Sequence, residues 1–346
     1  MNVALFSTFS SISPGSADGP DDGMAFTNSI NRPILLRDIV FDWDWTVPAR
    51  TLVKTYGAPL GDALRVQAKI GNHPLTAGYV PIPLVGTISD WRANTPPMTA
   101  SGDVIHSTFT WAFPRPLWIP PNVALQIQIQ HQNDFAVDVN APATTIDVTA
   151  RGAVDETGFT PSYVDIPYCA AYLGPVRSTV SGGQTGLLPM VTSQTAQTDL
   201  FNPFDVPLAI DRFRYGVTVS SHGYDSGNAV NANFAPTAAT SAQDQTSALA
   251  SGQGYGLDRR YVNIKLTSAV GRSLIKDYLP IGAVISSTNR SLGAGVLLDA
   301  RRYYIAQIQE QMPLFTDRGT LPFQMRTTLA IVGSRRVPIG SVAYAY

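Results

Sequence analysis

The chain has 346 residues, of which 44% are hydrophobic and 14% are charged. This length exceeds that of one ordinary domain and predicts two, and the apolar content excludes a disordered chain. The formal net charge is -1 and no block of Lys or Arg occurs. This argues against nucleic-acid binding, because gripping phosphates requires clustered positive charge.

The first thirty residues have the composition of a flexible arm. Residues 1–30 contain several Gly, Pro and Ser residues and lack the basic start of a signal peptide. No uninterrupted apolar run in the chain approaches the ~20 residues that span a bilayer. We expect a soluble protein synthesised in a cytoplasm, with an N-terminal arm that is extended or disordered until a partner binds it.

Short runs of alternating hydrophobicity follow, separated by turns drawn from the 28 Gly and 26 Pro residues. In the run 41–45, which reads FDWDW, the aromatic residues fall on one face of an extended strand and both aspartates on the other. Residues 125–130 and 146–149 alternate in the same way. Short strands between turn residues are typical of an all-β sandwich.

The second half begins with loosely patterned sequence. Residues 155–200 are rich in Gly, Ser, Thr and Gln and are expected to connect two domains. Residues 220–256, also rich in small residues, are predicted to form a long surface loop, where binding functions are common. Apolar residues within Ser268–Leu279 recur every four positions, which predicts one short helix.

Internal self-similarity predicts the domain organisation. Three anchor segments recur in the same order in both halves of the chain, with proline, aliphatic and aromatic positions in step. The repeat predicts two similar domains over residues 31–154 and 201–346. The paired anchors are Pro33–Phe41 with Pro207–Tyr215, Val66–Ile82 with Val262–Ile281, and Pro116–Ile129 with Pro313–Thr327.

Residues able to carry catalysis are few and scattered. No two histidines have the i, i+2 or i, i+4 spacing that directs two imidazoles at one metal from a single element. The one cysteine, Cys169, cannot form an intramolecular disulfide. We therefore predict no catalytic, cofactor-binding or metal-binding residues, and no enzymatic activity. The four histidines are His73, His106, His131 and His222.

Other polar groups give equally weak signals. Asp42 and Asp44 share a strand face and could hold a hard cation, but a solvated face is the simpler interpretation. The glycines of residues 252–256 lack the following apolar helix that a phosphate-binding turn requires. The pairs Arg301-Arg302 and Arg335-Arg336 are expected inside or beside strands, where inter-subunit or rim hydrogen bonds suit them.

The order of these motifs resembles that of the double jelly-roll major capsid proteins, the lineage of adenovirus hexon and the tailless, membrane-containing bacteriophages. The duplicated anchors carry the resemblance, which covers residues 31–154 and 201–346. It implies two tandem eight-stranded jelly rolls. In that family, three chains with two similar domains each form a pseudo-hexameric trimer, and such trimers tile an icosahedral shell.

The resemblance also implies partners and a location. The chain is expected to form a homotrimer, to contact neighbouring capsomers and minor capsid or vertex proteins, and to reside in the virion capsid. The arm at residues 1–30 would reach neighbouring capsomers or an internal lipid membrane. Its lack of basic residues gives no support for contact with DNA or anionic lipid, and no sequence-specific nucleic acid or cofactor is expected.

Two other classes of protein remain open. A spike or receptor-binding protein could use residues 220–256 to bind carbohydrate, with Tyr224, Phe234 and Tyr255 as the available aromatic side chains. A glycan-cleaving amidase could pair two jelly rolls around an acidic cleft. The two glutamates of the whole chain leave few candidates for its acid–base chemistry.

Overall fold

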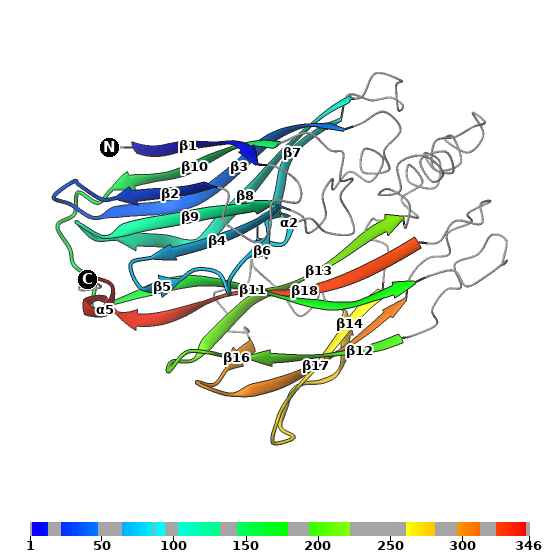
Figure 1. Ribbon diagram of the computed structural model, residues 1–346. Coiled ribbons are helices and arrows are strands. Elements are labelled where there is room, and N and C mark those ends of the chain that lie inside the picture. The colour runs from blue at the N-terminus through cyan, green and yellow to red at the C-terminus, as the bar shows by residue number, and fades with distance from the viewer. Residues whose placement is uncertain are drawn as a thin grey trace.

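The computed structural model describes residues 2–12, 22–47, 64–85, 87–93, 103–131, 144–178, 194–221, 261–280, 296–311 and 323–343. The regular structure within them is almost entirely β, in four antiparallel sheets. These sheets form two sandwiches, which lie one above the other in Figure 1. The predicted all-β fold class is confirmed.

Within the described residues, the first sandwich contains ten strands and a short helix. They are β1 (Asn2–Ile12), β2 (Asp22–Thr27), β3 (Ile34–Val47), β4 (Leu64–Ile70), β5 (His73–Pro74), β6 (Val80–Pro81), α2 (Ile82–Val85), β7 (Thr87–Ala93), β8 (Asp103–Ile119), β9 (Ala124–His131) and β10 (Thr144–Val154). One sheet has the order β1-β10-β3-β8-β7, and the other has the order β2-β9-β4-β5 with β6 also paired to β4. Since β5 and β6 have 2 residues each, eight longer strands form the body of this sandwich.

The second sandwich has eight strands within the described residues. They are β11 (Tyr163–Ser178), β12 (Gln194–Phe201), β13 (Leu208–Ser221), β14 (Tyr261–Ser268), β15 (Ser273–Pro280), β16 (Val296–Leu298), β17 (Tyr303–Gln311) and β18 (Phe323–Pro338), followed by the short helix α5 (Ile339–Ala343). One sheet has the order β11-β18-β13-β16, and the other has the order β12-β17-β14-β15.

Both sandwiches share the order of the first three strands in each sheet. In each, one sheet joins the first strand to the last and then to the third. The facing sheet joins the second strand to the next-to-last and then to the fourth. Eight antiparallel strands wound into two facing sheets in this way form a jelly roll. The predicted pair of tandem jelly rolls is therefore confirmed by topology.

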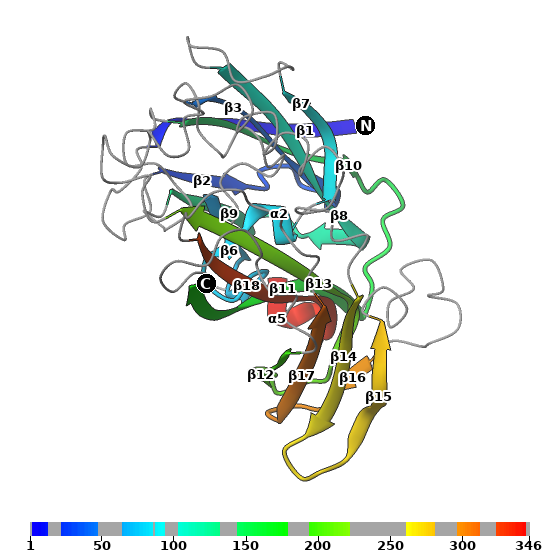
Figure 2. The same ribbon diagram turned by 90° about the vertical axis from the view of Figure 1, so that its right-hand side faces the viewer.

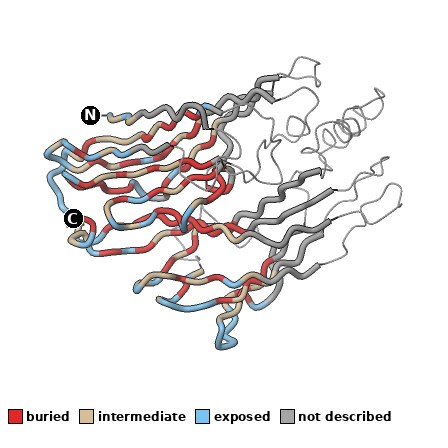
Figure 3. Tube along the Cα trace, viewed as in Figure 1, coloured by how far each residue is buried: buried red, intermediate tan, exposed pale blue. Residues whose placement is uncertain are grey.

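Alternating burial along the strands holds each pair of sheets together (Figure 3). In β9, the leucine and isoleucines of Leu125–Ile129 are fully buried, whereas the intervening glutamines are partly exposed. Phe41, Ile146 and Val148 are also fully buried, as their alternation predicts. Each such side chain contributes about 2 kcal/mol when it leaves water. The side chains of residues 43–47 lie outside the described set.

The two ends of the molecule differ in the length of their connections. The turns at one end, here called the turn end, comprise residues 28–33, 71–72, 120–123, 155–162, 202–207, 269–272 and 299–302. Strands leading into the longer connections finish at the opposite end, here called the loop end (Figure 1). Residues 222–260, which include most of the loop predicted over residues 220–256, lie outside the described residues.

Two segments predicted to lie outside the sandwiches belong to them. In place of a flexible arm over residues 1–30, β1 pairs with β10 and β2 pairs with β9. In place of a connection over residues 155–200, β11 pairs with β18 and β12 pairs with β17. The turn of residues 155–162 alone separates β10 from β11. Small polar residues and glycines misled the prediction because pairing with distant strands supplies the stability that local composition lacks.

The helix predicted over Ser268–Leu279 is wrong. This segment is a β-hairpin in which β14 pairs with β15. Its turn contains Gly271 at φ +83°, a conformation that residues with a Cβ rarely adopt. The Gly271 N–H donates to the Ser268 carbonyl at 2.8 Å. A spacing of four fits the two-residue period of a strand as well as a helical turn, so the apolar pattern is ambiguous.

Two of the three repeat anchors match equivalent strands. The first anchors lie in β3 and β13, each the third strand of its sandwich, and the second begin in β4 and β14, each the fourth. The third pairing is wrong, because residues 116–129 end in β9 whereas residues 313–327 lead into the final strand β18. The true partner of β9 is β17, in which isoleucine and glutamine recur in the same way.

Equivalent irregularities interrupt the third strand of each sandwich. The pairing register shifts between Leu36 and Asp38 in β3, and between Ile210 and Arg212 in β13. A glycine of the last strand lies against each bulge: Gly152 of β10 faces the Leu35 carbonyl, and Gly333 of β18 faces the Ala209 carbonyl. A Cβ on either glycine would collide with the facing backbone carbonyl. Each sandwich therefore pairs a bulge in its third strand with a glycine in its last strand, which leaves room for the bulged backbone.

A buried asparagine organises the turn between the second and third strands of each sandwich. Asn28 and Asn202 are both fully buried. The Asn28 amide donates to the carbonyls of Arg32 at 2.9 Å and Ile119 at 3.0 Å, and its oxygen accepts from the Ile30 N–H at 3.1 Å. These bonds satisfy backbone groups that the turn removes from both water and the sheets.

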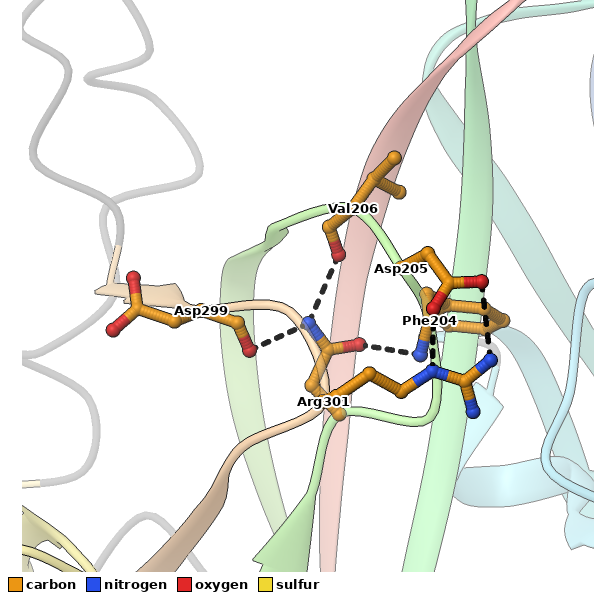
Figure 4. Close-up of polar contacts among 6 residues, drawn as sticks. Phe204, Asp205, Val206, Asp299 and Arg301 are labelled. Atoms are coloured by element: carbon orange, nitrogen blue, oxygen red, sulfur yellow. Dashed lines mark hydrogen bonds and ion pairs between the residues drawn. The ribbon is translucent and has the colours of Figure 1, made fainter.

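The second copy of this turn repeats the arrangement (Figure 4). The Asn202 amide donates to the carbonyls of Val206 at 3.0 Å and Asp299 at 3.0 Å, and its oxygen accepts from the Phe204 N–H at 3.1 Å. Beside it, Arg301 has φ 53°, uncommon for a residue with a long side chain. Its guanidinium holds the Asp205 carboxylate through bonds of 2.7 and 3.1 Å.

We expect Asn28→Ala and Asn202→Ala each to reduce the free energy of unfolding by about 3 kcal/mol, because buried carbonyls lose their donors. Urea titration followed by tryptophan fluorescence measures the change. Asn31→Ala alters an exposed asparagine three residues from Asn28 and is the matched control. Equal midpoints for Asn31→Ala and Asn28→Ala would show that the buried amide is dispensable.

Candidate functional site at the seam between the sandwiches

The two sandwiches share a continuous apolar core. Val164 and Ile166 of β11 and Val332 and Val337 of β18 belong to the same buried cluster as the interior of the first sandwich. The helix α2 of the first sandwich contacts β13 and β18 of the second, and Figure 2 shows it next to β13. Packing at this contact, here called the seam, stabilises one relative orientation of the sandwiches.

Backbone hydrogen bonds also cross the seam. The Cys169 N–H donates to the Leu75 carbonyl at 2.9 Å, and the Ala77 N–H donates to the Cys169 carbonyl at 2.8 Å. Thr76 and Cys169 thereby form a parallel bridge. Residues 75–77 of the first sandwich thus cover part of the outer edge of β11, and the Cys169 thiol is fully buried.

Arg335 of β18 is buried at the seam with 2% of its surface exposed. One guanidinium nitrogen donates to the Pro74 carbonyl of the first sandwich at 3.0 Å. The guanidinium carbon lies 3.8 Å from the ring centre of Phe204 and 5.7 Å from that of Tyr168, and these rings meet edge to face at 4.7 Å. The charge is therefore held by one carbonyl and two aromatic faces.

Burial at the seam shifts the pKa values of Arg335 and of two residues near it. Burial lowers the pKa of Arg335 to about 10, with a weaker opposing effect from Tyr168, so the guanidinium remains charged at neutral pH. Burial raises the pKa of the Tyr168 hydroxyl, because the charged form of tyrosine is the deprotonated one. For His73, burial lowers the pKa, the 3.0 Å hydrogen bond to the Ser341 carbonyl opposes this, and the positive charge of Arg335 adds to the lowering.

An ion-pair cluster closes the outer side of the seam. Asp165 of β11 accepts hydrogen bonds from Arg336 of β18 at 2.9 and 3.3 Å, and from Arg115 of β8 at 2.5 Å. Arg115 belongs to the first sandwich and the other two residues to the second. Burial tends to raise the pKa of Asp165, but the hydrogen bonds and charges of Arg336 and Arg115 outweigh it and lower this pKa.

The remaining residues singled out in the sequence are dispersed. Asp42 accepts a hydrogen bond from the Thr108 hydroxyl at 3.0 Å, and Arg302 is exposed. Among the described residues, no three His, Cys, Asp or Glu side chains gather as a metal site would require. In the same residues, no helix is long and apolar enough to cross a membrane. The side chains of Asp44, His106 and His131, and all of His222 and residues 252–256, lie outside the described set.

The sequence predicted Arg335 and Arg336 inside or beside a strand, with inter-subunit or rim hydrogen bonds as their role, and both lie in β18 but in opposite environments. Arg336 is exposed and pairs with Asp165, whereas Arg335 is buried. Because successive side chains of a strand point to opposite faces, the sequence predicts that two neighbouring arginines differ in burial, but it does not predict which one is buried. Asn28 and Asn202 were missed, although each stands five residues before the proline that opens a first anchor.

Comparisons with known proteins give distant similarity over nearly the whole chain. No protein-family model and no curated protein matches it. PBCV-1 VP54, fitted into a reconstruction of the virophage Sputnik, aligns with 10% identity and a TM-score of 0.44, covering 98% of this chain and 96% of that one. A chain of Sulfolobus Turreted Icosahedral Virus aligns with 11% identity and a TM-score of 0.43, covering 100% of this chain and 95% of that one. The mavirus major capsid protein aligns with 9% identity and a TM-score of 0.32, covering 94% of this chain and 86% of that one. Such values assign no function, so the functional conclusion rests on the topology and contacts of this chain.

We expect Arg335→Ala to reduce the free energy of unfolding by about 3 kcal/mol, because it leaves a cavity beside Phe204 and removes the donor of the Pro74 carbonyl. The neighbouring change Arg336→Ala removes an exposed ion pair and should cost less than about 1 kcal/mol. Urea unfolding of the two variants in parallel makes the comparison. Similar losses from both would refute a special role for the buried guanidinium.

Acid should abolish the contribution of the Asp165 cluster. Because the folded-state pKa of Asp165 lies below its ordinary 3.8, its stabilising effect is fully present above that value and is lost as the pH falls below it. The stability difference between the unmodified protein and Asp165→Asn should be about 1 kcal/mol at pH 6 and shrink by pH 3. Urea midpoints at both pH values test this, and a difference independent of pH would contradict it.

Proposed function

We propose that this chain is a structural virion protein, the major capsid protein of an icosahedral shell. The observation that carries the proposal is the fusion of two jelly rolls, alike in the order of the first three strands of each sheet, into one block through a continuous core. Three such chains around an axis would present six similar sandwiches, and a near-hexagonal block can tile a closed shell through repeated similar contacts. The proposed role is structural and not enzymatic.

The difference between the two ends of the molecule supports an oriented place in a shell. The turn end carries the compact turns organised by Asn28 and Asn202, whereas the longer connections begin at the loop end. We assign the loop end to the exterior, where variable length is tolerated, and the turn end to the interior. On this proposal the partners are two further copies in a homotrimer, neighbouring capsomers, minor capsid or vertex proteins, and an internal membrane where one is present.

The rigid seam gives the proposal its mechanical basis. A capsomer keeps six similar corners only if both sandwiches of each chain hold a fixed angle. The buried contacts of Arg335 with Pro74, and the Thr76–Cys169 bridge, favour one such angle. In a tandem binding module, by contrast, mobile sandwiches joined by a small polar contact are the usual arrangement.

Light scattering on the purified protein, followed by negative-stain imaging, tests the assignment. We expect a stable species near three times 37.2 kDa with a hexagonal outline. A monomer at all concentrations that never forms particles would overturn the capsid assignment. It would direct attention to the alternative, a carbohydrate-binding virion protein, for which glycan screening with and without residues 222–256 is the next experiment.

A further inference from the structure

The outer edge of β1 differs from every other sheet edge in the described structure. β1 borders its sheet and pairs only with β10 in the strand order, so its other side carries backbone N–H and C=O groups without a strand partner among the described residues. It runs along the top of the view in Figure 1. Unpaired strand edges bind other strands readily, and proteins usually protect them.

The other edge strands carry such protection. β5 and β16 have 2 and 3 residues. β7 has Asp90, Arg92 and a register shift, and β15 has Lys276, Asp277 and two shifts. The remaining three are protected in the same ways: β2 and β12 are short and each contains an aspartate, while β11 contains two prolines and is partly covered by residues 75–77. Charge, proline, brevity and cover are the recognised devices against edge pairing.

β1 carries neither charge nor proline, and its one register shift lies between Phe9 and Ile12, so that Asn2–Phe9 forms a long regular edge. It spans 11 residues, reading NVALFSTFSSI. Val3 and Leu5 pack against the core of the first sandwich, while Asn2 and Ala4 are exposed. The strand is therefore anchored on one face, and no described residue pairs with its long outer edge. A partner strand must match it in length and must not bring a charge that would lose water on pairing.

We propose that β1 binds β1 of a second copy of this chain, in antiparallel orientation, to form one continuous sheet across two molecules. Of all the edge strands described, β1 itself best meets the requirement of length without charge or proline. Antiparallel pairing of identical strands has two-fold symmetry, so the contact closes on itself and does not propagate into a fibre. The inference concerns β1 alone and holds whether or not the chain builds a shell.

Cysteine cross-linking determines both the contact and its direction. Single variants Ala4→Cys, Phe6→Cys and Thr8→Cys place one thiol in the regular part of β1, before its register shift, and the native Cys169 is buried and does not compete. Directly opposed residues of paired strands bring their Cβ atoms within disulfide range. Antiparallel pairing predicts that cross-linked residue numbers share a constant sum, so that a Phe6–Phe6 link would accompany Ala4–Thr8 links in mixed samples. Self-links at every position would indicate parallel pairing, and absence of links in capsomers and in particles would likewise overturn the proposal.

A charge placed on the edge supplies an independent measurement. Ala4→Lys adds a charge at an exposed position of β1 and should weaken the association about tenfold in sedimentation velocity. Ala112→Lys adds the same charge at an exposed position of the inner strand β8 and should leave the association unchanged. Equal effects of both would overturn the edge contact. Particles that form without β1 cross-links would refute this inference alone, and β1 cross-links in a protein that never assembles would refute the capsid assignment alone.

Discussion

The orientation of the two sandwiches depends on a guanidinium buried where they meet. Removing a charge from water costs several kcal/mol unless polar or aromatic groups replace the lost hydration. Arg335 receives part of that replacement from the Pro74 carbonyl in one sandwich and from the faces of Phe204 and Tyr168 in the other, while its second terminal nitrogen is buried without a hydrogen-bond partner among the described residues. All three groups surround the charge only when the two sandwiches hold one relative position. A change in the angle between the sandwiches would remove the Pro74 carbonyl from the buried cation. Apolar packing supplies most of the contact, and Arg335 makes it specific.

Repetition of backbone constraints explains how two sequences with few shared residues fold alike. Each sandwich has a buried asparagine that binds the turn before its third strand, a bulge within that strand, and a glycine facing the bulge. These positions fix the paths of the strands, whereas the positions between them need only alternate in polarity. The seam departs from this symmetry, because Arg335 of β18 and its aromatic partners are needed only where one sandwich meets the other.

This division between repeated and unique features suits a building block. The repeated features give two similar outer shapes, and the unique contact holds them in one body. Connections of unequal length then distinguish the loop end from the turn end without disturbing either jelly roll. The outer edge of β1, which has no strand partner among the described residues, adds a site for binding another strand, whereas the other edge strands are protected. Backbone pairing at this edge requires only an extended partner strand of matching length.

Alternation, turn residues and internal repetition were sufficient to predict an all-β fold with two similar sandwiches, because a strand with one buried face leaves a period of two in the sequence. The same local rules failed for β1, β2, β11 and β12, whose partners are far away in the chain, and for the hairpin of β14 and β15, where a spacing of four suits either structure. The sequence by itself determined the fold class and its duplication. Only the tertiary structure decided which arginine lies inside and which strand edge stays open, because both depend on side chains and strands brought together across the whole chain.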